Sequence, residues 1–410
     1  MVRRVIRALD VATRTVRTIV EADPANAGSA PPTESRDGMG REKAVAETAM
    51  LLLCAEPVRS LDERIREQAG AVAALLVPQA RRADVLGAIC LDPGLARDHA
   101  FAHAVLSRLG CPDPAVDRLL SESLAMGAGF GPERLPHRRL EQDWLARVWS
   151  AGETPRRRDA RLVAESMLGR PMDALGSTRL DIYAFTHAVM YASDLGERRI
   201  RLPRPLRAIA ADADAALAFG LDSNDFDLAA EVLLTWPMLG LPWSPAAIFA
   251  FRLLAGVEDD FGFLPGSSFD VARYEALSGD ERSRFALATS YHTAYVMGFL
   301  CAAALRQGCA PPAAVPPARR SRGAGAAMLR LLDSDGPTAC WRKPFDALAP
   351  RQQDSVAPLV LAALLRRART KGDLGLVRQA LEAALAHDLV DGPAPAQAAA
   401  LLRRSRALKL

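Results

Sequence analysis

Apolar residues recur at intervals of three and four along most of the chain, the spacing that places side chains on one face of an α-helix. Residues 61–77, 98–109 and 113–126 follow this pattern, and Gly or Pro residues separate one such stretch from the next. The alternating pattern of a half-buried strand is nearly missing from the sequence. The pattern predicts an all-α protein, an array of helical hairpins that forms an open solenoid or closes into an α/α toroid or barrel.

Breaks in composition divide the chain into segments with different expected roles. The first helix follows a basic amphipathic pattern and precedes a Pro-, Gly- and Ser-containing stretch, so we expect it to be tethered to the body, as an extension or docked on it, and not integral to the fold. The predicted segments are a basic amphipathic helix (1–22), a linker (23–41), a helical toroid-like body (42–308), a second linker (309–322) and a C-terminal helical cap (323–410).

Residues 286–305 carry no Asp, Glu, Lys or Arg, and the stretch is long enough in principle to span a bilayer. Ser290, Tyr291, His292, Thr293 and Tyr295 gather in its first half, which is unfavourable in lipid. We therefore predict a buried inner helix and no transmembrane segment.

The 410 residues include 52 basic and 48 acidic side chains, so their net charge of +4 is too balanced to indicate a nucleic-acid partner. The six cysteines form no CxxC pair, which argues against a zinc knuckle or a redox motif. We expect them to be small buried hydrophobes that stay reduced. Without a secretory hydrophobic region near the start, the sequence predicts a cytoplasmic protein.

The most informative stretch is 183–196, because it places polar side chains on an otherwise apolar helix. Tyr183, His187 and Tyr191 are each four residues apart and Asp194 follows three later, so all four are expected on one side. Polar groups on an apolar helix need a hydrogen-bond network, a metal or a solvated cavity.

Four further polar clusters stand out, and each also has an ordinary structural interpretation. Asn224 or Asp225 fits a helix N-cap, and Arg139 and Glu141 fit a structural ion pair. Asp98 fits a helix start, with His99 and His103 as surface residues, although they form an HxxxH pair. The clusters are 98–103, 136–144, 224–231 and 290–295.

Three of the five polar clusters lie on helices about one or two hairpins apart, so we expect them to meet in a central cavity. Helices beginning near Arg179, Asp225 and Arg284 should line it, with His187 and His292 mostly buried and facing the same space. The predicted catalytic residues are His187, Asp194, His292, Glu231 and Asp227. The predicted substrate-binding residues are Tyr183, Tyr191, Tyr291, Tyr295 and Arg139. The predicted ligands of a divalent transition metal are His187, Asp194, Glu231 and His292.

Common catalytic signatures are absent from the sequence, including GxGxxG, GxxxxGK[ST], GxSxG and HExxH. Neither the DDxxD nor the DxDD motif of terpene cyclases occurs. These absences leave the reaction open.

Two resemblances add to this interpretation. The segment 251–263, which ends in Asp260-Phe-Gly262-Phe, resembles the turn that recurs in α/α toroids of the terpenoid-cyclase and prenyltransferase type. Together with segments 135–145, 183–196, 225–233 and 291–293, it is similar to an uncharacterised family of actinobacterial all-helical proteins often found near natural-product gene clusters. The resemblance implies a toroid-like body, a bacterial cytoplasmic setting and a pocket lined by these His, Asp and Glu residues.

Two hypotheses about function follow. The first is an enzyme that tailors a bacterial secondary metabolite or a peptide natural product, with a His as general acid or base and a carboxylate that orients it or shares a metal. The alternative is a non-catalytic α-hairpin scaffold that binds a protein or carrier partner. In it, the polar stripe formed by Tyr183, His187, Tyr191 and Asp194 would fix the register of the helices.

Overall fold

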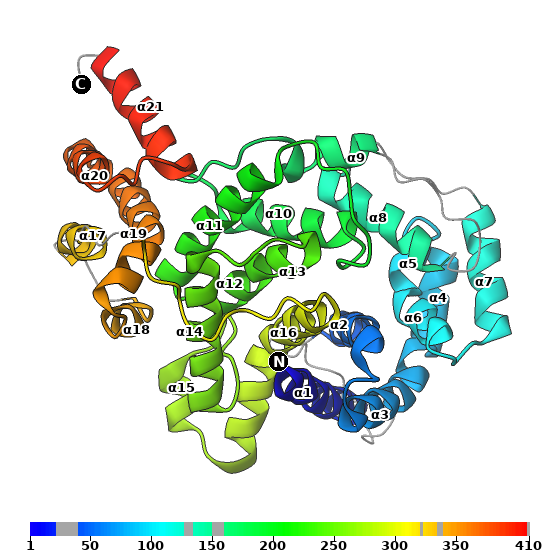
Figure 1. Ribbon diagram of the computed structural model, residues 1–410. Helices are drawn as coiled ribbons and strands as arrows, with labels where there is room; N and C mark the ends of the chain where they lie inside the picture. The colour runs from blue at the N-terminus through cyan, green and yellow to red at the C-terminus, as the bar shows by residue number, and fades with distance from the viewer. Residues whose placement is uncertain (22–39, 127–133, 150–159, 320–322, 334–338, 408–410) are drawn as a thin grey trace. The chain divides into compact units, whose positions relative to one another are not determined.

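The computed structural model describes residues 1–21, 40–126, 134–149, 160–319, 323–333 and 339–407. Within these ranges all regular structure is helical and no strand occurs, so the predicted all-α class is confirmed (Figure 1). Closure into a toroid stays a prediction. Most of the predicted linker 23–41 lies outside the described residues.

The chain forms two compact units, each assembled from distant segments. Unit 1 consists of 1–162, 190–199 and 263–310, and unit 2 consists of 163–189, 200–262 and 311–410. The predicted body, 42–308, is therefore divided between the two units, and the predicted cap belongs to unit 2. One boundary falls inside helix α10, after Val189.

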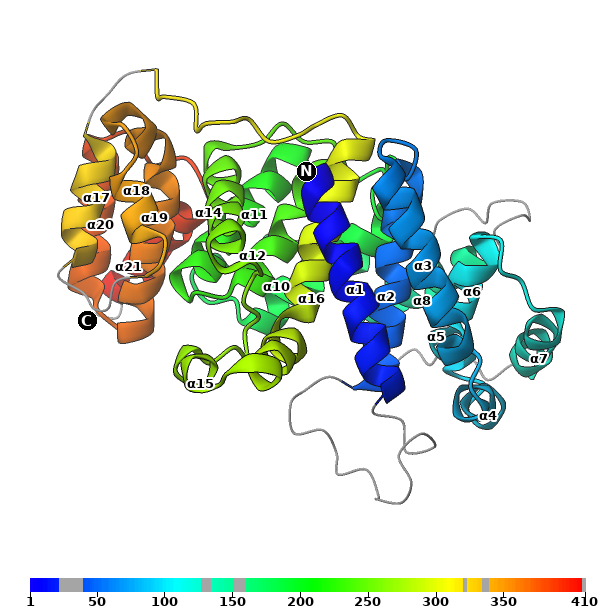
Figure 2. The ribbon, with the colours of Figure 1, turned by 90° about the horizontal axis from the view of Figure 1, so that it is seen from below.

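Unit 1 is built around the long helix α16. Its helices are α1 (Val2–Glu21), α2 (Arg41–Ala55), η1 (Glu56–Val58), α3 (Glu63–Ala80), α4 (Ala83–Leu91), α5 (Ala96–His99), α6 (Phe101–Arg108), α7 (Pro114–Ala125), α8 (Pro136–Trp149), α15 (Val271–Ala276) and α16 (Gly279–Arg306). Helix α9 (Ala160–Glu165) crosses from unit 1 into unit 2. Helices α1 and α2 both pack against α16, and α3 lies beside them (Figure 2).

The expectation that α1 is tethered and not integral was wrong. Val5, Leu9 and Val16 are fully buried, and α1 makes its most extensive packing with α16. The amphipathic pattern was correct for the helix itself, but its apolar face completes the core of unit 1.

Helix α16 confirms the expected buried helix at 286–305. Its side chains from Tyr291 to Ala304 are buried with the exception of His292. None of the helices in the described part of the chain combines the length and apolar character that a membrane crossing needs.

Unit 2 contains the helices that carry the predicted acidic cluster. Its helices are η2 (Met167–Gly169), most of α10 (Arg179–Ala192), α11 (Leu206–Asp222), α12 (Phe226–Leu233), α13 (Thr235–Leu239), α14 (Pro245–Phe261), α17 (Ala324–Asp333), α18 (Arg342–Asp346), α19 (Pro350–Lys371), α20 (Leu374–Ala386) and α21 (Pro393–Ala407). Helix α19 packs against α11, α14, α17, α20 and α21.

Close packing of α11 on α12 fixes the acidic cluster within unit 2. A Cβ atom on Gly220 would lie 3.1 Å from the backbone nitrogen of Ala229, so glycine permits this close approach. Asn224 lies in the connection with a φ of 55°, and Asp225 then caps α12 by accepting a hydrogen bond from the Leu228 N–H. The predicted N-cap is confirmed.

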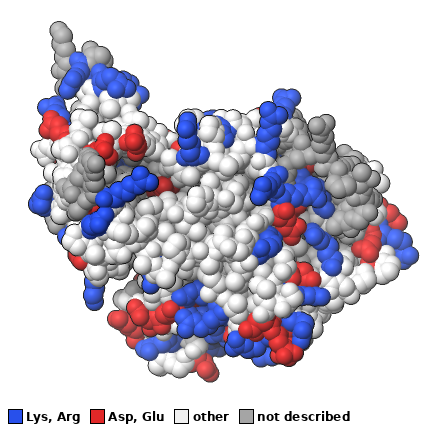
Figure 3. All heavy atoms as spheres, in the orientation of Figure 1, with Lys and Arg blue, Asp and Glu red and all other residues white. Residues whose placement is uncertain are grey.

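Charged side chains of both signs are mixed over the face shown in Figure 3. This agrees with the near balance of basic and acidic residues in the sequence.

Candidate functional site

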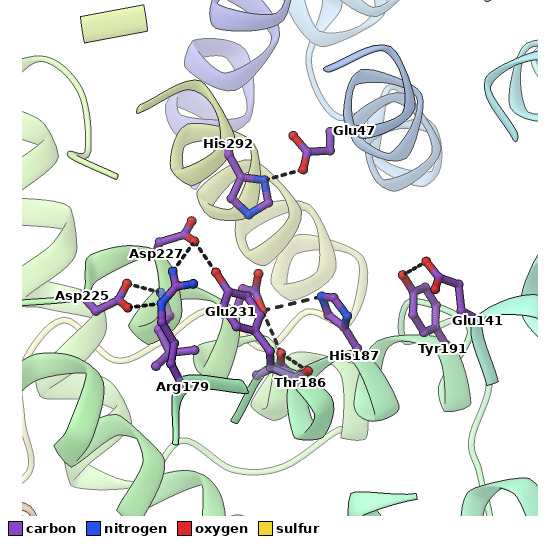
Figure 4. A network of polar contacts seen from close by, with 12 residues as sticks. Glu47, Glu141, Arg179, Thr186, His187, Tyr191, Asp225, Asp227, Glu231 and His292 are labelled. Atoms are coloured by element: carbon purple, nitrogen blue, oxygen red, sulfur yellow. Dashed lines mark hydrogen bonds and ion pairs between the residues drawn. The ribbon is translucent and has the colours of Figure 1, made fainter. Parts of the chain in front are cut away.

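The candidate site lies in unit 2, where polar side chains of α10 meet those of α12 (Figure 4). Thr178 and Asp181 start α10 by exchanging hydrogen bonds, in the manner of a capping box. We call the following residues the α10–α12 cluster: Arg179, Tyr183, Thr186 and His187 on α10, and Asp225, Asp227 and Glu231 at the start of and along α12. Helical spacing places the four α10 residues on one side of that helix, and it places Asp227 and Glu231 on one side of α12, with Asp225 at its N-cap.

Arg179 joins two carboxylates of the cluster. Its Nε donates to Asp225 Oδ2 across 2.6 Å, and its Nη2 lies 3.4 Å from Asp227 Oδ2. The guanidinium also lies over the Tyr183 ring, 4.4 Å from the centroid. Although burial acts to lower the pKa of Arg179, the hydrogen bond to Asp225 and the neighbouring negative charges raise it well above its usual value. Arg179 is therefore a permanent cation in this cluster.

Tyr183 is held as a hydrogen-bond donor. Its hydroxyl group donates to Asp227 Oδ2 across 2.7 Å. Burial raises the pKa of Tyr183 strongly, and the charges of Glu231 and Asp227 raise it further. The phenol therefore keeps its proton, and Asp227 keeps a fixed partner.

Glu231 lies between a threonine and a histidine of α10. The Thr186 hydroxyl group donates to Glu231 Oε2 across 2.7 Å, and His187 Nε2 lies 3.9 Å from the same oxygen. The Glu231 side chain is 4% exposed, whereas that of His187 is 26% exposed. The pair thus links a buried carboxylate to an imidazole that reaches solvent.

The donor types of this cluster suit both proton transfer and a divalent cation. Imidazole and carboxylate groups are ligands of Zn²⁺, Fe²⁺ and Mn²⁺. The contacts between the two helices involve three carboxylates and one guanidinium, that of Arg179, so negative groups outnumber permanent positive ones. Within unit 2, His187 and Glu231 bring an imidazole nitrogen and a carboxylate oxygen to 3.9 Å from each other, and Asp227 precedes Glu231 by four residues on α12.

His292, Tyr291 and Tyr295 belong to unit 1 and have partners there. His292 Nδ1 lies 3.0 Å from Glu47 Oε1 on α2. The Tyr295 hydroxyl group hydrogen-bonds Thr48 across 3.0 Å, and its ring packs edge-on against that of Tyr291. The predicted common cavity of His187 and His292 joins residues of two units, and it stays a prediction.

The C-terminal members of the predicted polar stripe, Tyr191 and Asp194, also belong to unit 1. The Tyr191 hydroxyl group donates to Glu141 across 2.8 Å. Helix α10 ends at Ala192, so the expectation that Asp194 lies on this helix was wrong. Asp194 lies beyond the helix end, with a φ of 55°. Asp194 accepts a hydrogen bond of 2.8 Å from the indole of the buried Trp144.

The clusters 136–144 and 98–103 give mixed outcomes. Arg139, a predicted substrate-binding residue, lies partly exposed on α8, where Glu141 forms an ion pair with Arg138. The expectation of a surface position was wrong for His103, which is fully buried and hydrogen-bonded to Asp117 across 2.8 Å. His99 ends α5 and His103 lies in α6, so the HxxxH pair is interrupted by a helix boundary.

Sequence reasoning missed Arg179, Thr186 and Glu47 as partners of the predicted residues. Arg179 precedes Tyr183 by four residues, so the same helical spacing could have identified it. Glu47 carried no comparable signal, because its role depends on the packing of α2 against α16.

The fold and the cluster define an all-α protein with a buried acidic and imidazole-containing site between two helices of one unit. A family model with the description Domain of unknown function (DUF6895) matches residues 6–302. The chain belongs to this family. Neither the search of curated proteins nor that of solved structures gave a match.

Proposed function

We propose that the protein is an enzyme that modifies a small molecule or a peptide, with His187 as general acid or base and Glu231 as the carboxylate that orients it. The observation that carries this proposal is that His187 Nε2 lies 3.9 Å from Glu231 Oε2. A partly exposed imidazole thus approaches a buried carboxylate. Such contacts are often long in a free enzyme and tighten when substrate binds.

The division of roles follows from the surroundings of each group. Glu231 is buried and fixed by Thr186, so it is suited to stabilise an imidazolium without leaving its position. His187 reaches solvent, so its ring is the group that can exchange a proton with substrate. Asp227 would serve as a second carboxylate if a divalent cation takes part. Tailoring of a bacterial secondary metabolite is the finer form of this proposal, and it rests on the family resemblance of the sequence.

The test is to incubate the purified protein with a bacterial metabolite extract and to follow compounds consumed or formed by mass spectrometry. Compounds converted by the native protein should persist with H187Q and E231Q. H387Q and E382Q, in the same unit but outside the cluster, are matched controls and should convert them normally. Folded H187Q and E231Q proteins that convert the same compounds at the native rate would disprove the assignment.

Metal content provides a second measurement. A transition metal bound at one equivalent in the native protein, retained in H387Q and lost in H187Q and E231Q, would support the metal-dependent form. Equal metal content in all of these variants would exclude His187 and Glu231 as ligands.

The second candidate function is a scaffold that binds a protein or carrier partner. It is favoured by the contacts of Arg179 with Asp225 and Asp227. A side chain of α10 that bridges the N-cap and the first turn of α12 fixes the register of the two helices. On this hypothesis H187Q changes the unfolding free energy but no chemistry, and a constant partner is captured by both the native protein and the variant.

A further inference from the structure

Unit 1 contains a cavity of about 410 Å³ whose wall is rich in polar groups. It is lined by Asp98 of α5, by Arg134 just before α8, and by Arg138, Glu141 and Gln142 of α8. Its volume falls in the range of small-molecule sites. None of these residues belongs to the α10–α12 cluster, so the cavity is built from a different set of side chains.

Gln142 is the observation that points to a ligand. Its side chain is 4% exposed, and its Oε1 atom is buried with no hydrogen-bond partner among the described residues. A buried polar atom without a partner is costly, because it has given up its hydrogen bonds to water. An N–H group of a bound molecule would satisfy this acceptor.

The charged groups of the wall are two carboxylates and two guanidiniums. Arg138 forms an ion pair with Glu141 across 2.6 Å, and Glu141 also accepts the Tyr191 hydroxyl group, so both are held in place. Arg134 contacts the Gly94 carbonyl oxygen at 3.4 Å through one of its nitrogens, and a guanidinium has further N–H groups to offer. A ligand with one negative and one positive end matches such a wall better than one with a single charge.

Asp98 is the carboxylate with most to gain from a cationic ligand. Burial raises the pKa of Asp98, and the negative charge of Glu141 raises it further. An ammonium group beside Asp98 would offset both effects.

The remainder of the wall is apolar. Leu95 and Leu135 line the cavity, and Leu135 is an exposed large hydrophobic residue. An apolar group that covers Leu135 would be favoured by the removal of apolar surface from water.

We propose that this cavity binds a free α-amino acid with a large apolar side chain. Its carboxylate contacts Arg134, its ammonium group donates to Asp98 and to Gln142 Oε1, and its side chain packs against Leu95 and Leu135. The site goes beyond the proposed enzymatic function and does not depend on it.

The test is isothermal titration of the full chain with L-leucine and L-phenylalanine, alongside the N-acetyl and amide derivatives of each. At least one amino acid should bind, and the derivatives should bind at least tenfold more weakly, because each lacks one of the two charges. The proposal is overturned if neither amino acid binds at millimolar concentration, or if the derivatives bind equally well.

Variants locate the site. Q142L and R134Q should weaken binding at least tenfold, whereas Q79L should bind as the native protein does. Gln79 is a matched control, because it is also buried in unit 1 with an unpaired Oε1 but does not line the cavity. Q142L should melt no lower than the native protein, since it removes an unsatisfied oxygen. Unchanged binding in Q142L, or equal loss in Q79L, would overturn the assignment.

Discussion

Thr186 donates its hydroxyl hydrogen to Glu231 across 2.7 Å, and the oxygen that receives it is the one that faces His187. The contact joins α10 to α12 one residue before the histidine on the chain. The position of the carboxylate relative to the imidazole therefore depends on a side chain that is itself neither acidic nor basic.

Replacement of Thr186 by valine should destabilise unit 2. Valine keeps the shape of threonine but leaves Glu231, which is almost fully buried, without this donor, at an expected cost of about 1–3 kcal/mol. T186S keeps the hydroxyl group and should recover most of that loss. Urea unfolding of the three proteins measures the difference, and equal unfolding free energies for T186V and T186S would contradict the role given to this hydrogen bond.

Asp214 should make stability depend on pH near neutrality. Burial raises the pKa of Asp214 from 3.8 to about 7, although a hydrogen bond of 2.5 Å from Ser244 opposes the shift. Between these values the folded state holds a proton that the unfolded state has released, so stability falls as pH rises through this window, by up to about 1.4 kcal/mol per unit.

Replacement of Asp214 by asparagine should remove this dependence. D214N should therefore gain stability relative to the native protein as the pH rises from 4 to 8. Thermal unfolding across that range measures the effect, with D346N on α18 as the control. A constant difference between D214N and the native protein at every pH would show that Asp214 does not titrate in this way.

Leu9 should be essential to unit 1. It is fully buried in the face of α1 that packs on α16, so L9A should cost about 2–5 kcal/mol through lost burial and a cavity. Leu91 is 88% exposed, and L91A should stay close to the native stability. Chemical denaturation of both variants measures how much this packing of α1 contributes, and equal stability of L9A and L91A would contradict it.

The cysteines should react with iodoacetamide in a defined order. Cys90 is exposed and should be alkylated first. Burial raises the pKa of the Cys54 thiol to about 12 and that of Cys340 to about 11, so few thiolates form at either position. Peptide mapping after brief labelling of the folded protein provides the measurement, and modification of Cys54 as fast as Cys90 would contradict the packing of α2.

The expectation that all six cysteines are small buried hydrophobes holds for Cys54 and Cys301 and fails for Cys90. The sequence around Cys90 does not reveal its exposure, because α4 is apolar and yet Ile89 is its one buried residue. The same limit applies to α1, whose amphipathic face was predictable while its partner α16 was not.

What the sequence determined by itself is the all-α class and several helix ends. The helix predicted to begin near Arg179 begins there, and Asp225 caps α12, because periodicity and capping act between residues only a few positions apart. The candidate residues His187, Asp227 and Glu231 were likewise visible as polar groups on apolar helices.

Only the tertiary structure decided which side chains these residues meet. Tyr183 reaches Asp227 over a separation of 44 residues, and Thr48 reaches Tyr295 over 247. Such partners are chosen by the packing of whole helices, as Gly220 shows by letting α11 approach α12. The sequence states that a buried polar group needs a partner, but the identity of that partner depends on distances that only the folded chain defines.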